Sequence, residues 1–471
     1  RDQPRSRGLG DVYKRQVADR LNSVIVSSFT GQCVEQKGTS KYEFRQDEFW
    51  RKLERWHSVD ADTFLNHLWQ EKNAVTSVAV LGDLIKDITP AGFVSDIEKG
   101  HQLAPMSIRL TPYILSLIDW SNPYFDPLRR QFLPLASEIE VDHPMVQLDP
   151  MGEQNDSPAM GLTHRYPDRV LFLATNVCPV YCRYCTRSYA VGLDTDVVTK
   201  QKINAPGERW EPAFRYIAAN SSVEDVVVSG GDAYRLKARQ ITDIGERLLE
   251  IPHVRRMRFA TKGLAVLPMK IQSDHEWTDA IARLSDRARK MGKSIAIHTH
   301  FNHPNEITDM TVKALRILYE RGVEVRNQAV ILKGVNNNAT DMHRLNECLA
   351  YCNVRPYYCF QGDMIRGVET LRTSLADSIA LEKSTRGLIA GHNTPHFIVD
   401  LPGGGGKRDI HSFDYYDKHV GVAVYRAPAV KKDKFFLYCD PLHTLASDVQ
   451  ALWLSPASRT QLLNDVVHAA Y

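Results

Sequence analysis

Three cysteines stand within eight residues, in the segment NVCPVYCRYCTR: Cys178, Cys182 and Cys185. Thiolates are the usual ligands of iron–sulfur clusters, and three thiolates would leave one iron of a four-iron cube open to an outside ligand. A structural zinc site takes four ligands, usually in two spaced pairs, and no fourth Cys or His stands nearby. A disulfide beside a free thiol is atypical of a large chain with one tight cysteine cluster. The spacing favours a catalytic iron–sulfur cluster, with zinc and a disulfide as alternatives.

Two glycine-containing segments could hold further ligands. SGGD (229–232) follows an apolar run, and a glycine pair there is by itself typical of a simple turn. LPGGGGKRD (401–409) sets Lys407 behind four glycines, which from composition alone indicates a flexible linker with a solvated lysine. That run also ends an apolar segment, and glycines permit the close backbone approach of a ligand loop. A lysine that forms and releases a Schiff base needs such freedom.

These segments need elements that bring them together, and the chain after Gly161 has a regular pattern. Short apolar runs alternate with helical stretches, at 169–176, 224–232, 254–263, 293–302, 324–334, 353–363 and 396–407. Alternating strands and helices predict βαβ units and a parallel sheet. About six units predict an α/β fold with a full or partial (β/α)6-type barrel, whose chemistry lies at the carboxyl ends of the strands. Each candidate segment falls at such an end, so we expect one shared site.

Composition restricts the function classes. The 471 residues carry a net charge of +3, with 43% hydrophobic and 24% charged residues. This small charge predicts no coating of nucleic acid, and no apolar run approaches the roughly 20 residues of a membrane span. The single cysteine cluster indicates a reducing compartment, and we expect a cytoplasmic enzyme. We expect a disordered or non-native leader (1–41), an N-terminal helical region (42–160), a barrel (161–365) and a C-terminal region with Lys407 (366–471).

Together these segments resemble a known family. C-x3-C-x2-C after a first barrel strand is similar to the motif of the radical S-adenosylmethionine (SAM) superfamily, in which an element like SGGD holds the methionine part of SAM. GLTHRYPDRVLFLATNVCPVYCRYCTR, HTHFNHPNEIT, VRPYY and FIVDLPGGGGK resemble the lysine 2,3-aminomutase family. The resemblance implies a radical SAM barrel, a 4Fe-4S cluster, SAM and pyridoxal 5′-phosphate (PLP). Some relatives bind zinc through a C-terminal cysteine motif that this chain lacks, so we expect no zinc.

The resemblance also implies roles for single residues. The three cysteines would bind the cluster, and Lys407 would bind PLP as an imine. Residues near PLP would be Arg165, Tyr166, Arg169 and Tyr357; residues near SAM would be Ser229, Gly230, Gly231, Asp232, His300 and Gln328; residues near the substrate would be Arg187, Asp363 and Asp400. For His300 and Gln328 the alternative is a buried, fully hydrogen-bonded polar core.

The implied reaction is the interconversion of L-lysine and β-lysine by 1,2-migration of the amino group. Arg187 would hold the substrate carboxylate, and Asp363 with Asp400 would hold its far ammonium group. Two neighbouring carboxylates raise each other's pKa unless a cation lies between them, so an ammonium group binds by relieving their repulsion. This acidic pair disfavours glutamate as the substrate. The same chemistry on arginine or another cationic amino acid is the alternative.

Other classes of function explain less of the sequence. An iron–sulfur electron carrier would account for the cysteines but not for Lys407, Asp363 and Asp400. An enzyme that modifies a protein- or tRNA-linked group is opposed by the small net charge and by the lack of an added basic module. The resemblance implies an electron donor of the flavodoxin or ferredoxin type and a homo-oligomer, with no nucleic-acid or membrane partner.

The sequence departs from the family pattern at several positions. RSYAVG (187–192) replaces a basic run, Lys262 stands where an arginine is usual, and Phe360 stands where a second tyrosine is usual. Arg366 lies three residues past Asp363, where it could pair with that carboxylate and weaken the ammonium site.

Overall fold

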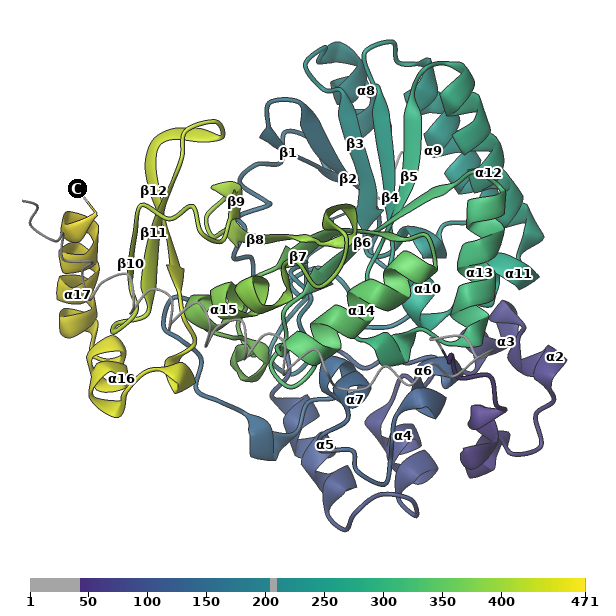
Figure 1. Cartoon of the computed structure of the whole chain (residues 1–471), viewed down its shortest axis with the longest axis horizontal. Coiled ribbons are helices and arrows are strands. Elements are labelled where there is room, and N and C mark those ends of the chain that lie inside the picture. Colours follow the sequence, from purple (N-terminus) through teal and green to yellow (C-terminus); the bar gives the residue numbers. More distant parts are fainter. Residues whose placement is uncertain (1–42, 204–209, 471) are drawn as a thin grey trace, which may run out of the picture. The chain divides into compact units, whose positions relative to one another are not determined.

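A nine-stranded sheet organises the chain after residue 161 (Figure 1). Its strands lie in sequence order: β1 (Leu162–Tyr166), β2 (Arg169–Thr175), β3 (Asp225–Gly230), β4 (Arg256–Ala260), β5 (Ser294–Thr299), β6 (Glu324–Val330), β7 (Arg355–Phe360), β8 (His396–Leu401) and β9 (Gly406–Asp409). β2 to β8 are parallel, while β1 and β9 pair antiparallel at the two edges. The sheet is nearly closed and barrel-like, which confirms the predicted α/β fold with a partial barrel.

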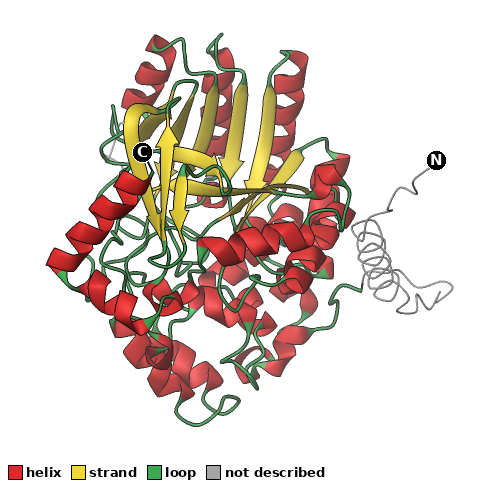
Figure 2. Ribbon diagram, turned by 60° about the vertical axis from the view of Figure 1, so that its left-hand side comes forward, coloured by secondary structure: helices red, strands yellow, loops and turns green. Residues whose placement is uncertain are grey.

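Helices join the parallel strands and flank the sheet (Figure 2). They are α8 (Glu211–Ala219), α9 (Ala238–Glu250), α10 (Gly263–Val266), α11 (Lys270–Ser273), α12 (His275–Lys290), α13 (Asp309–Glu320), α14 (Ala339–Tyr351) and α15 (Leu375–Thr385). Short 3-10 helices are η1 (Phe49–Lys52), η2 (Glu54–Trp56), η3 (Ala136–Glu138), η4 (Ala233–Arg235), η5 (Pro304–Glu306), η6 (Glu369–Leu371), η7 (Gly391–Asn393) and η8 (Leu442–Thr444).

The local sequence explains these elements. β3 is buried at nearly every position, because a parallel strand in an α/β fold is covered on both faces. α12 begins after Asp274, whose side chain accepts a hydrogen bond from the Trp277 amide as an N-cap. Trp277, Ile281, Leu284 and Ala288 of this helix are buried at spacings of three and four residues, as an amphipathic helix on a sheet requires.

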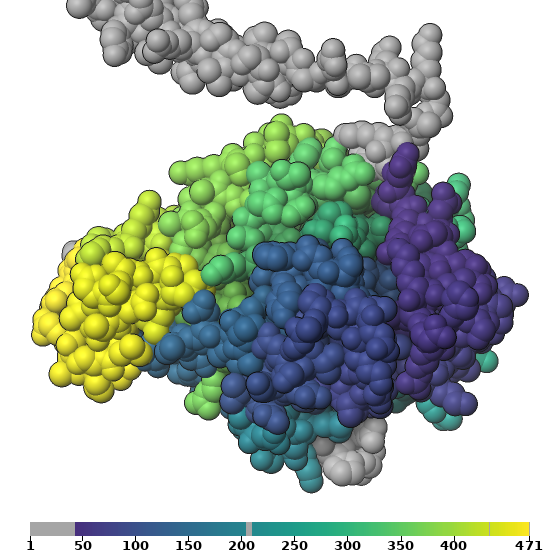
Figure 3. All heavy atoms as spheres, turned by 90° about the horizontal axis from the view of Figure 1, so that it is seen from below, coloured from purple at the N-terminus to yellow at the C-terminus, as the bar shows by residue number. Residues whose placement is uncertain are grey.

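The N-terminal helical region supports the loop that carries the cysteines. Its helices are α2 (Ala61–Phe64), α3 (His67–Lys72), α4 (Val78–Ile85), α5 (Phe93–Gln102), α6 (Pro112–Leu117) and α7 (Pro127–Phe132). The Tyr181 amide donates to the Arg109 carbonyl, and the Arg183 amide to the Gln131 carbonyl, both at 3.0 Å. Figure 3 shows this region in purple and blue.

The C-terminal residues form a small sheet with two helices. β10 (Tyr415–Asp417), β11 (Val422–Ala427) and β12 (Lys431–Cys439) pair antiparallel, and α16 (Ser447–Leu454) and α17 (Pro456–Ala469) follow. Lys431 Nζ donates to the Gly403 carbonyl at 3.2 Å, so β12 contacts the glycine turn before Lys407.

The computed structural model describes residues 43–203 and 210–470, and the predicted leader at 1–41 lies outside them. The described residues from 44 onward form one compact unit, in which β8 and β9 extend the barrel sheet. The predicted boundaries at 160 and 365 remain predictions. In the described part of the chain, no helix combines the length and the apolar character that crossing a membrane requires.

Candidate active site

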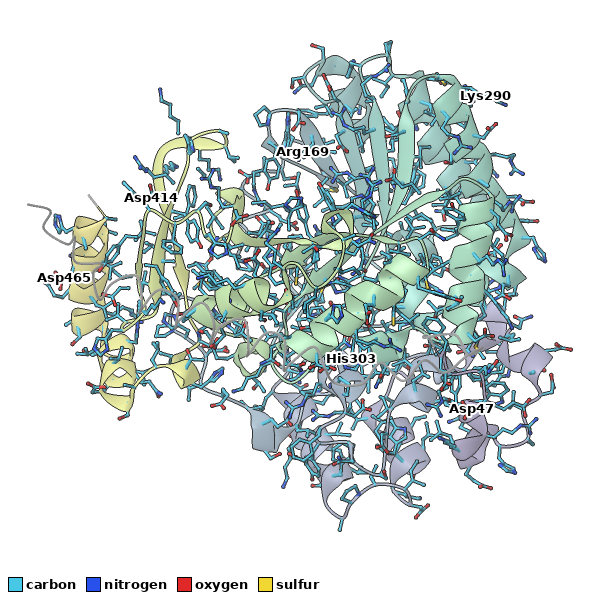
Figure 4. The ribbon with its side chains drawn as sticks, viewed as in Figure 1. Asp47, Arg169, Lys290, His303, Asp414 and Asp465 are labelled. Atoms are coloured by element: carbon cyan, nitrogen blue, oxygen red, sulfur yellow. The ribbon has the colours of Figure 1, made fainter. Side chains whose placement is uncertain are left out.

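A cavity of about 390 Å³ lies inside the barrel and is lined by residues from every strand of the nine-stranded sheet. All the predicted site residues line this cavity except Gly230 and Tyr357. The fold therefore gathers the cysteines, the candidate PLP lysine and the two candidate substrate carboxylates around one space. Figure 4 labels Arg169, the first residue of β2, which is one of the residues that line the cavity.

The three cysteine thiols share the cavity wall. The tyrosines between them also line the cavity, and they belong to two buried clusters against which the cysteines pack: Tyr181 with Met106, and Tyr184 with Leu332. Burial raises the pKa of Cys182 to about 12 and also raises the pKa of the other two thiols. Binding a metal cluster must therefore displace protons from the thiols. Across 43–203 and 210–470, no three His, Cys, Asp or Glu side chains are grouped so that they could hold a single metal ion.

The glycine pair after β3 fixes the start of the cysteine loop. Gly230 has φ +113°, and a Cβ atom there would lie 2.1 Å from the Thr175 carbonyl oxygen. The Gly231 amide donates to that same carbonyl at 2.6 Å, and the Asp232 amide donates to the Val177 carbonyl at 3.0 Å. Glycine is required at position 230 because a side chain would separate β3 from the segment that leads to Cys178.

Asp232, the acid of the SGGD element, is buried against the next strand. Its carboxylate accepts hydrogen bonds from the amides of Tyr234 at 2.8 Å and Lys262 at 2.7 Å. Burial raises the pKa of Asp232 in spite of these bonds. Asp232 thus connects the ends of β3 and β4 and also lines the cavity.

His300 and Gln328 already have partners within the protein. His300 Nδ1 bonds to the Gln328 carbonyl, and His300 Nε2 lies 3.0 Å from the Tyr184 hydroxyl. Burial and the nearby charge of Lys262 together lower the pKa of His300 to about 3, so the ring is neutral. The Gln328 side chain contacts His298 Nδ1 at 2.9 Å. Both residues line the cavity as members of a hydrogen-bonded polar core.

Lys407 lies in strand β9 and not in a free loop. β8 and β9 form a hairpin in which Lys407 is the direct partner of Asp400. Lys407 Nζ donates to Asp400 Oδ2 at 2.7 Å, and the Lys407 amide donates to the Tyr166 hydroxyl at 2.9 Å. Burial alone would lower the pKa of Lys407, but the Asp400 carboxylate holds it above its usual value. The glycines form the turn, while the lysine backbone is fixed by the sheet.

Asp363 and Asp400 each present a buried oxygen without a hydrogen-bond partner, Oδ1 in both cases. Asp363 Oδ2 accepts from the Thr186 hydroxyl at 2.9 Å, and Arg165 Nη1 lies 3.9 Å from Asp400 Oδ1, beyond hydrogen-bonding distance. Burial and the charge of Asp400 together raise the pKa of Asp363 to about 7. The exposed Arg366 forms no ion pair with Asp363, so the pairing considered from the sequence is not present.

Arg187 is held by a buried glutamate that the motifs did not reveal. Its Nε and Nη2 donate to the two carboxylate oxygens of Glu153 at 2.8 and 2.7 Å. The Tyr189 hydroxyl donates to Glu153 at 3.0 Å, so a residue of the divergent RSYAVG segment belongs to this cluster. Burial alone would lower the pKa of Arg187, but Glu153 holds it above its usual value. Nη1 remains available to a carboxylate in the cavity.

The two arginines of the HRYPDR element differ. Arg165 Nε donates to Asp156 at 2.8 Å and its Nη2 donates to the Met151 carbonyl at 2.7 Å. Arg169 stacks on the Tyr166 ring at 4.5 Å, and its buried Nε has no hydrogen-bond partner, although it lies 3.0 Å from Asp168. Each of the two arginines thus pairs with one carboxylate, Arg165 with Asp156 and Arg169 with Asp168.

A β-bulge separates Tyr357 from the cavity. The register of β6 and β7 shifts between Asn327 and Gln328, whose partners are Pro356 and Tyr358, so Tyr357 is the extra residue. Tyr358 lines the cavity, and Tyr357 donates to its hydroxyl at 3.1 Å. Sequence reasoning missed Tyr358, because a bulge is not visible in an apolar run. It also missed Glu153, which stands outside every motif.

These residues fit the implied groups. Three thiols on one wall are the donors that an iron–sulfur cluster requires. Lys407 and Arg169 face the same space, as a lysine and a phosphate-binding cation for PLP must. The unpartnered oxygens of Asp363 and Asp400 match an ammonium group.

Comparison with known proteins gives a consistent picture, although no family model matches the chain. The chain is 37% identical to L-lysine 2,3-aminomutase of Clostridium subterminale over 362 residues, 76% of this chain and 81% of that protein. It is 36% identical to L-lysine 2,3-aminomutase of Bacillus subtilis over 366 residues, 77% of this chain and 72% of that protein. It is 35% identical to glutamate 2,3-aminomutase of Clostridioides difficile over 346 residues, 73% of this chain and 76% of that protein.

Proposed function

The chain belongs to the lysine 2,3-aminomutase family, and from that premise we propose that it interconverts L-lysine and β-lysine. Family membership makes it an aminomutase-like isomerase. We further propose that lysine is the substrate, that the enzyme depends on PLP, and that it uses radical SAM chemistry. When bound, the 4Fe-4S cluster with SAM would supply a carbon radical that abstracts hydrogen. PLP would supply a conjugated carbonyl group that holds the amino nitrogen while this nitrogen moves between neighbouring carbons.

The pair of unpartnered oxygens on Asp363 and Asp400 supports a cationic substrate most directly. An ammonium group has three donors and one positive charge, which satisfies both oxygens and relieves the repulsion that raises the pKa of Asp363. A glutamate side chain would bring a further negative charge to the same place. The guanidinium group of arginine carries the same charge as an ammonium group, so arginine is the second candidate.

The other residues of the site have complementary roles. Arg187 Nη1 would hold the substrate α-carboxylate, while Glu153 fixes the orientation of the guanidinium group. Asp400 Oδ2 would accept the proton of Lys407 Nζ when this nitrogen reacts with a carbonyl, since the two atoms are 2.7 Å apart. The residues Tyr166, Phe360 and Tyr358 surround this end of the cavity and exclude water from it.

Two partner proposals follow from the same function. An electron donor of the flavodoxin or ferredoxin type would reduce the cluster, as the family resemblance implies. The family resemblance also implies a homo-oligomer.

A substrate panel tests the proposal. The anaerobically reconstituted protein, with SAM, PLP and a chemical reductant, should convert lysine to a β-amino acid. Arginine, ornithine and glutamate, tested at equal concentration, should react at least about tenfold more slowly, because a misplaced or missing charge costs more than 1.4 kcal/mol. If the protein converts arginine and not lysine, arginine replaces lysine as the proposed substrate. If it converts none of the four amino acids, the proposed aminomutase function is contradicted.

A further inference from the structure

Two arginines lie beside the cysteine loop without reaching the cavity. Cys178, Tyr181 and Asp232 line the cavity, whereas Arg109 and Arg235 do not. The Tyr181 amide donates to the Arg109 carbonyl at 3.0 Å, and the Arg235 amide donates to the Asp232 carbonyl at the same distance. The two arginines are therefore backbone neighbours of the cavity wall, and their side chains lie outside it.

Arg109 is a cation without a partner. Its guanidinium group forms no hydrogen bond or ion pair with the residues of 43–203 and 210–470, and its Nε atom is buried. Burial and the neighbouring charge of Arg235 lower the pKa of Arg109, against the opposing effect of Glu71. An unpaired, half-buried cation is costly, and a carboxylate that approaches from outside would remove this cost.

Arg235 and Lys237 add further positive charge. Arg235 Nη1 pairs with Glu71, but the buried Nε of Arg235 has no hydrogen-bond partner. Lys237 follows two residues later, is exposed, and forms no ion pair within the part of the chain that the structure describes. Arg109, Arg235 and Lys237 carry three positive charges, of which Glu71 offsets one.

An exposed apolar residue belongs to the same surface. Val177 directly precedes Cys178, and its carbonyl accepts a hydrogen bond from the Asp232 amide at 3.0 Å, three residues before Arg235. We call Val177, Arg109, Arg235 and Lys237 the basic face. An apolar contact bordered by charged groups is typical of a protein–protein interface.

We propose that the basic face is the docking surface for the electron donor, and that this donor is a small acidic redox protein. The inference rests on the proposed function, because it requires an iron–sulfur cluster at the three cysteines. Electron transfer slows steeply with distance, and Val177 is the immediate neighbour of a cluster ligand on this face. SAM, PLP and the substrate would fill the cavity, so the donor approaches from outside it.

The charge of the face determines the kind of donor. Redox proteins form small and weak interfaces, in which complementary charge raises the rate of association more than it raises affinity. A flavodoxin with acidic side chains around its flavin would supply carboxylates to Arg109 and Lys237. A cationic donor would be repelled by the same groups.

The test measures reduction of the cluster without turnover. The reconstituted chain is mixed anaerobically with photoreduced flavodoxin, and the second-order rate constant is taken from the absorbance change of the cluster. Arg109→Gln and Lys237→Glu should each lower this constant by about tenfold at low ionic strength, because charge steering is lost. The difference should vanish at about 1 M salt, where the screening length is about 3 Å.

Controls separate docking from an effect on the cluster itself. The methyl viologen radical, a small cation, should reduce all variants at least as fast as the unmodified protein. Arg109→Lys keeps the charge and should retain most of the rate with flavodoxin. Lys290→Glu makes the same change of net charge as Lys237→Glu, but at a 76% exposed lysine that precedes β5 at the amino ends of the strands, and should leave the rate unchanged (Figure 4).

Each outcome bears on one claim. An unchanged rate with flavodoxin in both Arg109→Gln and Lys237→Glu overturns the inference. Equal slowing with methyl viologen also overturns it, as does a changed oligomeric state in sedimentation with an unchanged rate, which would assign the face to a second copy of the chain. Where Arg109→Gln does not hold the cluster, the exposed Lys237→Glu decides. Failure of the unmodified protein to bind a four-iron cluster overturns the proposed function itself.

Discussion

Replacing Lys407 with alanine should abolish covalent attachment of PLP and lower lysine turnover by about 10³-fold or more, the scale of losing a covalent catalytic group. Lys407 Nζ is the amine that faces the cavity beside Arg169 and Tyr166. The readouts are the visible absorbance of bound PLP and the mass of the borohydride-reduced peptide that contains residue 407.

A matched variant separates the chemistry from the fold. Lys407→Ala leaves the Asp400 carboxylate without its 2.7 Å partner; because the Lys407 side chain is 32% exposed, we expect a loss of about 1–3 kcal/mol, the scale of one unsatisfied polar group. Lys407→Arg keeps a cation beside Asp400 but cannot form an imine, so it should unfold near the temperature of the unmodified protein and still not attach PLP.

A second buried lysine gives an internal comparison. Lys262 also lines the cavity, but its Nζ donates to Glu306 at 2.7 Å and to the His300 carbonyl at 3.0 Å, near Cys182. Covalent PLP at Lys262, or retention of the PLP absorbance in Lys407→Arg, would contradict the assignment of Lys407.

Replacing Asp363 with asparagine should weaken lysine binding by about 10- to 100-fold, because one charge-assisted hydrogen bond to the ammonium group is lost. The amide can still accept the Thr186 hydrogen bond, and it removes the repulsion from Asp400, so folding is not at risk. Binding is measured by calorimetry on the cofactor-loaded protein without a reductant, so that no turnover occurs.

The same carboxyl group sets a pH dependence. The pKa of Asp363 is raised to about 7, so the group is neutral below that pH and ionised above it. The side-chain ammonium of lysine stays protonated across this range, because its pKa is about 10.4. Lysine affinity should therefore rise as the pH increases from 6 to 8, because Asp363 loses its proton within about one pH unit of 7. The Asp363→Asn variant, which has no such proton to lose, should show a flat profile.

Asp142 is a suitable control carboxylate. Burial also raises the pKa of Asp142, which accepts a hydrogen bond from the Gly367 amide outside the cavity wall. Asp142→Asn should leave both the lysine affinity and its pH profile unchanged. An unaltered profile in Asp363→Asn would exclude Asp363 from the ammonium site.

The sequence predicted the fold where local pattern decides it. Parallel strands such as β3 are short, apolar and followed by polar ends, so the alternation of strands and helices predicts the parallel sheet and the partial barrel. Lys407 was expected in a mobile glycine loop, but a hairpin pairs it with Asp400. The difference arises because β9 pairs with β8 at the edge of the sheet, and the glycine content of the segment does not indicate this pairing.

The site was predicted less completely than the fold. Tyr358 replaces Tyr357 on the cavity wall because of a bulge between β6 and β7, and bulges are set by the pairing of strands distant in sequence. Glu153 carries no motif, and its significance lies in its burial and in the two side chains, Arg187 and Tyr189, that donate to it. Such features appear only in three dimensions.

One labelling experiment tests the central claim, that this chain moves the amino group of lysine between neighbouring carbons. Lysine labelled with nitrogen-15 at the α-amino group is incubated with the reduced, cofactor-loaded protein, and the product is examined by NMR. The proposal predicts β-lysine with the label on the β-carbon nitrogen, at undiminished enrichment even when unlabelled ammonia is present. Absence of β-lysine, or loss of the label to ammonia, would contradict it.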